Sequence, residues 1–207
     1  MGVENNMDLA DAAATPAVGV APAATLIYVG FWRRLAAYVL DFAILIPYGL
    51  LTKQLIYLSR PAYLANLLVE FFIGIAFEVY LVKRFGGSPG KLIMRIRIAK
   101  LDGSPVGYRE AWIRYSVLFV ISILSSVGLV LSLFGMSELD YAAFAALKSP
   151  IRSLEAGAPA WYQPLQIAGA IWIYSEFLML LTNRKRRALH DFMAGTVVIQ
   201  TAAKTTL

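Results

Sequence analysis

Four apolar segments, each about as long as a bilayer is thick, limit this chain to a small set of folds. They lie at about residues 35–55, 63–82, 116–136 and 165–182. A helix of about twenty apolar residues crosses the hydrocarbon layer, because each residue adds about 1.5 Å. Of the 207 residues, 59% are hydrophobic and only 15% are charged, which is typical of membrane proteins. The sequence predicts an all-α membrane protein with about four transmembrane helices.

The segments outside these helices are predicted to be tails. Residues 1–27 are rich in Ala and Pro and lack the basic start and long apolar core of a signal peptide, so we expect a disordered cytoplasmic tail. Residues 28–200 form the predicted transmembrane domain, and 201–207 form a second tail. Pro47 lies within the first span and predicts a kink there.

The basic residues predict how the protein is oriented. If both termini and the connection at 83–114 lie on one side, that side holds 15 of the 19 Lys and Arg residues. The positive-inside rule makes it the cytoplasmic side. We therefore expect a multi-pass protein of the bacterial cytoplasmic (inner) membrane with both termini in the cytoplasm. The outer loop at 137–164 is long for a small bundle, and the sequence assigns it no role.

Composition argues against several classes of function. Without Cys there is no disulfide framework and no thiol nucleophile, and a single His makes a zinc site improbable. No G-x-S-x-G motif is present, and "GGSPGK" departs from the phosphate-binding loop pattern. We expect no enzymatic activity, cofactor or resident metal. The net charge of +6 fits the inner surface of a lipid bilayer better than nucleic acid.

The connection between the second and third spans shows a two-residue period. Apolar and basic residues alternate from Met94 to Ile98, and Asp102-Gly103 is a turn signal. This pattern predicts a short β-strand or β-hairpin on the membrane surface, with its basic side towards anionic lipid headgroups. An ordinary solvated basic loop is the alternative.

Charged residues within the spans are the strongest functional signal. Arg34 and Asp41 are seven positions apart, which on a helix is about 20° around the axis and about 10 Å along it. With the orientation above, Asp41, Glu78 and Glu176 each lie about 6 to 9 Å below the cytoplasmic boundary. Glu70 is deeper. A carboxylate in hydrocarbon costs about 3 kcal/mol, and so its presence needs a reason.

Two interpretations of these charges remain open. Arg34 is the only obvious cation at this level, so some carboxylates would be protonated or would bind a cation, as in a proton or cation pathway. Alternatively, Arg34 and Asp41 form a structural ion pair while Glu78 and Glu176 reach water.

The carboxyl-terminal segment continues the charged pattern. Four bases at 184–187 mark a cytoplasmic boundary, and His190-Asp191 precede "FMAGTVVI", an apolar run too short to span. We expect this run to fold back against the bundle or lie at the interface, which would bring Asp191 towards Arg34. His190 is either a packed residue or a proton relay, because its side chain titrates near neutrality.

Three motifs together resemble the signatures of the RDD family of integral membrane proteins. They are "GFWRRLAAYVLD", "GGSPGKLIMRIRIAKLDGSP" and "RRALHDFMAGTVVI". The family's Arg and two Asp correspond to Arg34, Asp41 and Asp191, and its "GK" step to Gly90 and Lys91. The resemblance implies a small bacterial membrane protein, with transport suggested and cation/proton exchange claimed for some members.

Two functions compete. The first is a transporter of protons or a monovalent cation through membrane carboxylates, for which we expect a homodimer because four short helices enclose little volume. The second is a non-catalytic scaffold or accessory subunit that binds a protein partner or anionic lipid on the cytoplasmic side. Asp41→Asn separates them, since it would abolish flux in the first case and destabilise the fold in the second.

Overall fold

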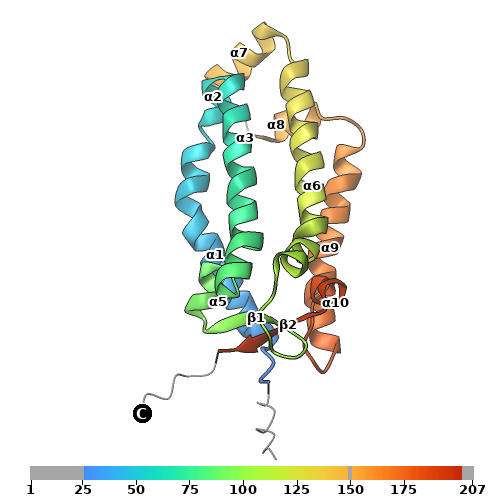
Figure 1. The fold of residues 1–207 in the computed structure, drawn as a ribbon. Helices are drawn as coiled ribbons and strands as arrows, with labels where there is room; N and C mark the ends of the chain where they lie inside the picture. Colours follow the sequence, from blue (N-terminus) through green and yellow to red (C-terminus); the bar gives the residue numbers. More distant parts are fainter. Residues whose placement is uncertain (1–25, 149–150, 202–207) are drawn as a thin grey trace, which may run out of the picture.

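The computed structural model describes residues 26–148 and 151–201. The tails predicted at 1–27 and 201–207 lie outside this range except for their innermost residues. The described part is mainly helical (Figure 1). Its elements in chain order are α1 (Phe31–Thr52), α2 (Leu55–Leu58), α3 (Arg60–Ile75), the π-helical turn η1 (Ala76–Tyr80), α4 (Leu81–Phe85), α5 (Pro89–Ile93), β1 (Ile96–Lys100), α6 (Tyr108–Gly135), α7 (Glu138–Leu147), α8 (Ile151–Ala156), α9 (Tyr162–Thr182), α10 (Leu189–Ala194) and β2 (Thr196–Gln200).

Four helical segments are long and apolar enough to cross a membrane. They are Phe31–Leu58, Arg60–Ile93, Tyr108–Gly135 and Tyr162–Thr182. The long helices α1, α3, α6 and α9 run along one another as a bundle (Figure 1). The predicted all-α membrane protein with four spans is confirmed. Pro47 lies inside α1, which continues to Thr52.

The third span begins earlier than its charge-free stretch indicates. Helix α6 starts at Tyr108, where the Glu110 carboxylate accepts a hydrogen bond of 2.8 Å from the Gly107 backbone N–H. This bond satisfies one of the free donors at a helix start. The early start places Arg114 on the helix, two turns inside its beginning.

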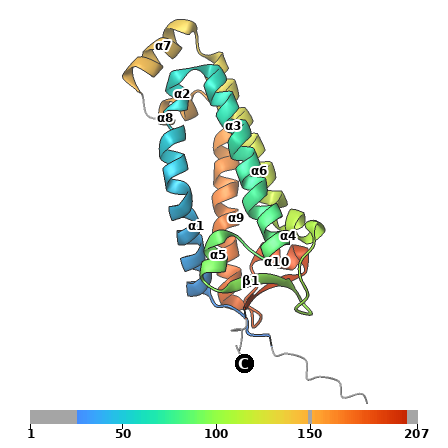
Figure 2. The ribbon, with the colours of Figure 1, turned by 60° about the vertical axis from the view of Figure 1, so that its left-hand side comes forward.

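The strand predicted in the basic connection is present as β1, and its partner is the distant strand β2. The two strands pair antiparallel, with Ile98 opposite Val198. The turn at Asp102-Gly103 also folds the connection back, so that Pro105 forms a bridge with Ala99. We call the end of the bundle that carries β1 and β2 the strand end; both described chain ends lie there (Figures 1 and 2).

The opposite end, called here the α7 end, is closed by the segment between the third and fourth spans. The Ser137 hydroxyl caps α7 by accepting a hydrogen bond of 3.1 Å from the Asp140 backbone N–H. Phe144 of α7 and Leu154 of α8 are buried against Ile56. Most of this predicted outer loop is therefore helical and covers one end of the bundle (Figure 2).

Candidate functional site

Asp191 is the centre of a buried charge cluster at the strand end. Its side chain is fully inaccessible, and its Oδ2 accepts hydrogen bonds of 2.8 Å from Arg34 Nη1 and of 2.9 Å from the Ala188 backbone N–H. Arg114 Nη1 and the Thr196 hydroxyl donate to Oδ1. Four donors from different parts of the chain thus saturate one carboxylate.

Two arginines supply the positive charge of this cluster. Arg34 is 4% exposed, and its Nη2 also donates to the Arg186 carbonyl at 2.5 Å. Arg114 donates to Thr196 Oγ1 at 2.5 Å as well. Burial by itself raises the pKa of Asp191, but the nearby charges of Arg114 and Arg34 outweigh burial and hold that pKa well below its usual range. Asp191 is therefore ionised at neutral pH.

His190 connects this cluster to the fourth span. Its Nε2 lies 2.7 Å from Arg114 Nη2, and its Nδ1 is in direct contact with the Glu176 carboxylate. Because a guanidinium can only donate, Nε2 must accept, so the ring proton is on Nδ1 and is donated to Glu176. His190 thus lies between the Arg114 guanidinium and the Glu176 carboxylate.

Asp41 belongs to a second, separate cluster. Its carboxylate accepts hydrogen bonds of 2.5 Å from the Ser88 hydroxyl and of 2.7 Å from the Gly90 backbone N–H. Lys91 Nζ lies 4.0 Å from Asp41 and donates to Ser88 at 3.0 Å. A Cβ atom on Gly90 would lie 2.2 Å from the Ala37 carbonyl oxygen, so only glycine permits this approach of α5 to α1. The Gly90-Lys91 step fastens α5 to the first span.

Arg34 and Asp41 do not pair with each other, although they lie on the same helix. Arg34 contacts Asp191, whereas Asp41 contacts the α5 segment. The structural alternative in which these two form an ion pair is therefore wrong. Their separation of about 10 Å along the axis exceeds hydrogen-bond reach, so each finds a partner from a different segment.

Glu78 lies on the second span within η1, a π-helical turn. In residues 26–148 and 151–201 it has neither a hydrogen bond nor an ion pair. The charges of both Glu78 and Glu176 act on the hydroxyl of Tyr38, so both carboxylates lie within electrostatic range of that hydroxyl. π-Helical turns occur frequently at functional sites.

Glu70 is remote from both clusters. It accepts a hydrogen bond of 2.7 Å from the Asn66 amide and lines a cavity towards the α7 end. The predicted residues therefore divide into three groups. Arg34, Asp191, His190 and Glu176 meet at the strand end, Asp41, Gly90 and Lys91 form the second cluster, and Glu70 and Glu78 belong to neither.

Sequence reasoning missed Arg114 and Ser88. Arg114 precedes the charge-free stretch of the third span, so the sequence assigns it to the connection. In the structure it lies on α6, three residues after the buried Ala111. With Arg114, the two carboxylates Asp191 and Glu176 face two arginines, and Lys91 accompanies Asp41. The excess of carboxylates at this level is reduced to Glu78. Within the described ranges no three His, Cys, Asp or Glu side chains gather in a way that could hold a metal ion.

The comparisons with known proteins bear on the whole transmembrane region. Residues 28–195 match the family model described as the RDD family. This range contains Arg34, Asp41 and Asp191, and the match confirms the resemblance. No curated protein and no solved structure matches the chain.

Proposed function

Since the chain belongs to the RDD family, we propose that it is a small membrane transporter that moves protons or exchanges them for monovalent cations. The contact between His190 and Glu176 inside the strand end carries this proposal. An imidazole and a carboxylate in direct contact can pass a proton from one to the other. Glu78, which has no partner among the described residues, supplies a further proton acceptor on the neighbouring span.

The proposed path runs from Glu78 past the Tyr38 hydroxyl to Glu176 and His190. Tyr38 lies within the electrostatic reach of both carboxylates. A proton that arrives on Glu176 removes its charge and weakens the hydrogen bond to His190, because charge-assisted hydrogen bonds are about twice as strong as neutral ones. Since His190 also accepts a hydrogen bond from Arg114, protonation of Glu176 changes the contacts of the Asp191 cluster as well.

Arg34, Asp191 and Asp41 act as the fixed frame of the path in this proposal. The Asp191 cluster joins α1, α6 and α10, and Asp41 joins α1 to α5. Buried carboxylates with several donors are poor proton carriers, because the ionised form is strongly favoured. The moving protons therefore belong to Glu78, Glu176 and His190.

We propose that the protein lies in a bacterial inner membrane with its strand end on the cytoplasmic side. This end carries the basic connection and the bases at 184–187, in agreement with the positive-inside rule. We also propose a homodimer, because the four helices of a single bundle enclose little volume.

Proteoliposomes that contain a pH-sensitive dye test the proposal. A gradient of Na⁺ or K⁺ should drive a change of internal pH with the wild-type protein, and Glu176→Gln and His190→Gln should lower the rate by about tenfold or more. Glu138→Gln, at an exposed carboxylate of α7, should leave the rate unchanged. Absence of flux above that of empty vesicles for every common monovalent cation would refute the transporter.

A scaffold or accessory subunit is the second candidate. The observation in its favour is the exposed basic surface of the strand end, which includes Arg33, Arg95 and the bases 184–186. Such a surface attracts anionic headgroups or an acidic protein partner. Purification of the tagged protein from membranes, followed by identification of what co-purifies, tests this candidate.

A further inference from the structure

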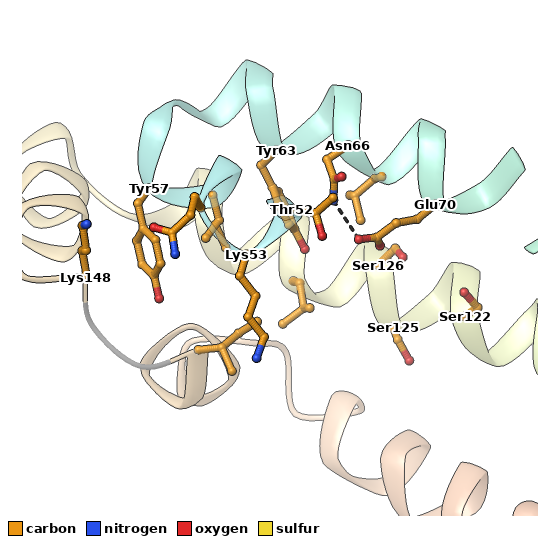
Figure 3. Close-up of a pocket in the computed structure, with 15 residues that line it drawn as sticks. Thr52, Lys53, Tyr57, Tyr63, Asn66, Glu70, Ser122, Ser125, Ser126 and Lys148 are labelled. Carbon is orange, nitrogen blue, oxygen red and sulfur yellow. Dashed lines mark hydrogen bonds between the residues drawn. The ribbon is translucent and has the colours of Figure 1, made fainter. Parts of the chain in front are cut away.

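A cavity of about 590 Å³ lies between the helices towards the α7 end. Its walls come from the end of α1, from α2, α3 and α6, and from the start of α8 (Figure 3). None of Glu78, Glu176 and His190 lines it. The cavity is therefore a feature separate from the proposed proton path, and its volume is in the range of small-molecule sites.

Charges of both signs line this cavity, namely the carboxylate of Glu70 and the ammonium groups of Lys53 and of Lys148, which follows α7. Glu70 belongs to α3, and Lys53 directly follows α1 (Figure 3). Within the part of the chain that the structure describes, neither side chain has an ion-pair partner within 4 Å. Both residues are exposed, so each charge is accessible to a ligand that enters the cavity. Lys53 and Glu70 thus both face the cavity without an ion-pair partner in the described chain.

The polar wall of the cavity is rich in hydroxyl groups. Ser122, Ser125 and Ser126 lie on α6 (Figure 3). Ser125 accepts a hydrogen bond of 2.8 Å from Gln166, whereas the hydroxyls of Ser122 and Ser126 have no side-chain hydrogen bond in the described ranges. On the facing wall, Asn66 holds Glu70 in place and accepts from the Tyr48 hydroxyl at 3.0 Å. The carboxylate of Glu70 is thus oriented in advance.

The remaining wall is apolar. It is formed by side chains of α2, α3, α6 and α8, namely Ile56, Leu67, Leu129 and Ile151. A cavity with one apolar side and a few placed polar groups is the usual form of a small-molecule site.

Charge and size together indicate the class of ligand. A bare metal cation requires several oxygens close around it, whereas this space is much larger than an ion and Lys53 repels cations. A simple anion would leave the Glu70 carboxylate without a cationic partner. We propose that the cavity binds a small zwitterion with an apolar side chain, of the class of the aliphatic α-amino acids. Its ammonium group pairs with Glu70, its carboxylate pairs with Lys53, and its side chain contacts the apolar wall.

Equilibrium binding to the purified protein in detergent tests this proposal without any ion gradient, so its outcome is independent of the proposed transport of protons. Radiolabelled L-leucine is the probe. Two matched compounds each lack one charge: isopentylamine has no carboxylate, and 4-methylpentanoate has no ammonium group. Leucine should bind saturably, and each analogue should compete about tenfold more weakly or worse, because each loses one charge-assisted contact.

Charge-neutral variants locate the binding. Glu70→Gln and Lys53→Met should each weaken leucine binding by about tenfold or more. Glu138→Gln and Lys185→Met, at exposed positions outside the cavity, should bind as the wild type does. Gel filtration identifies variants that fail to fold, and the comparison of ligands on the wild-type protein needs no variant.

Four results would overturn the proposal. They are no saturable binding of leucine to the wild type, competition by isopentylamine as strong as by leucine, unchanged affinity in both folded cavity variants, and occupancy by phosphatidylethanolamine headgroups alone. The second result would indicate a site for cations, and the fourth a site for lipid.

Discussion

Arg114 and Asp191 are 77 positions apart in the chain and are in direct contact through one guanidinium nitrogen and one carboxylate oxygen. The other oxygen of Asp191 receives Arg34, from 157 positions away. One buried carboxylate therefore joins the first span, the third span and the carboxyl-terminal helix α10.

Replacing Asp191 should strongly destabilise the protein. Asp191→Asn leaves two buried guanidinium groups without an anion, and removal of one partner from a buried ion pair costs about 3–5 kcal/mol. Thermal unfolding in detergent measures the loss. Asp102→Asn, at an exposed turn of the same end, is the control and should change little. An unfolding midpoint of Asp191→Asn equal to that of wild type would contradict the role given to the cluster.

The same carboxylate predicts how stability depends on pH. The pKa of Asp191 in the folded protein lies below its value of about 3.9 in an unfolded chain. The stabilisation is therefore fully present above about pH 4 and is lost as the pH falls further, through the folded pKa. The difference in unfolding midpoint between wild type and Asp191→Asn should stay constant from neutral pH to about pH 5 and shrink below about pH 4. A difference that shrinks between neutral pH and pH 5 would show that another group titrates.

Gly90 should tolerate no side chain. The Cβ atom of Gly90→Ala would meet the Ala37 carbonyl oxygen at 2.2 Å, so α5 would have to move away from α1. Such overpacking costs about 1–3 kcal/mol, and it would also lengthen the Asp41 contacts with Ser88 and Gly90. Gly135→Ala is the matched control, because nothing lies within 4 Å of its added Cβ. Equal unfolding midpoints for the two variants would show that α5 adapts without cost.

Asp41 and Glu176 should respond differently in the flux assay. Asp41→Asn keeps an oxygen that accepts from the α5 segment and should lower stability by about 1–2 kcal/mol, while the folded fraction retains flux. Glu176→Gln should stay folded and lose flux. If Asp41→Asn is folded and inactive while Glu176→Gln is active, then Asp41 belongs to the proton path and Glu176 has a structural role.

The Arg114 guanidinium should not be replaceable by an amine. It contacts Asp191, Thr196 and His190 at once. A lysine ammonium is a compact point charge and cannot reach all three partners. Arg114→Lys should therefore lower the unfolding midpoint, whereas Arg109→Lys, one turn earlier and exposed, should not. Equal effects of the two changes would indicate that charge alone matters at position 114.

Several parts of the fold could be predicted from local sequence. Apolar stretches of about twenty residues predict spans, because each polar group placed in lipid adds its own unfavourable free energy. The alternation from Met94 to Ile98 predicted β1, since one face of a strand is buried. The expectation that Asp191 approaches Arg34 came from an apolar run too short to cross the membrane, and the contact of 2.8 Å agrees with it.

Most partners of the charged side chains could not be predicted from local sequence. Arg34 and Asp41 share a helical face, yet each binds a segment that returns from elsewhere in the chain. Arg114 was assigned to a loop because a charge ordinarily ends an apolar stretch, whereas burial against Asp191 allows α6 to include it. The alternation predicted a strand or a hairpin in the connection, and the strand β1 pairs with the distant strand β2.

The sequence by itself determined the class of protein, the number of spans, the family and, except for Arg114, the charged residues of the buried clusters. Only the tertiary structure decided which charges meet, that His190 contacts Glu176, and that Lys53 and Glu70 open into one cavity. The physical reason is range. Hydrophobicity and helical period act over a few neighbouring residues, whereas a buried ion pair or a cavity requires separate segments of the chain to be packed at fixed distances.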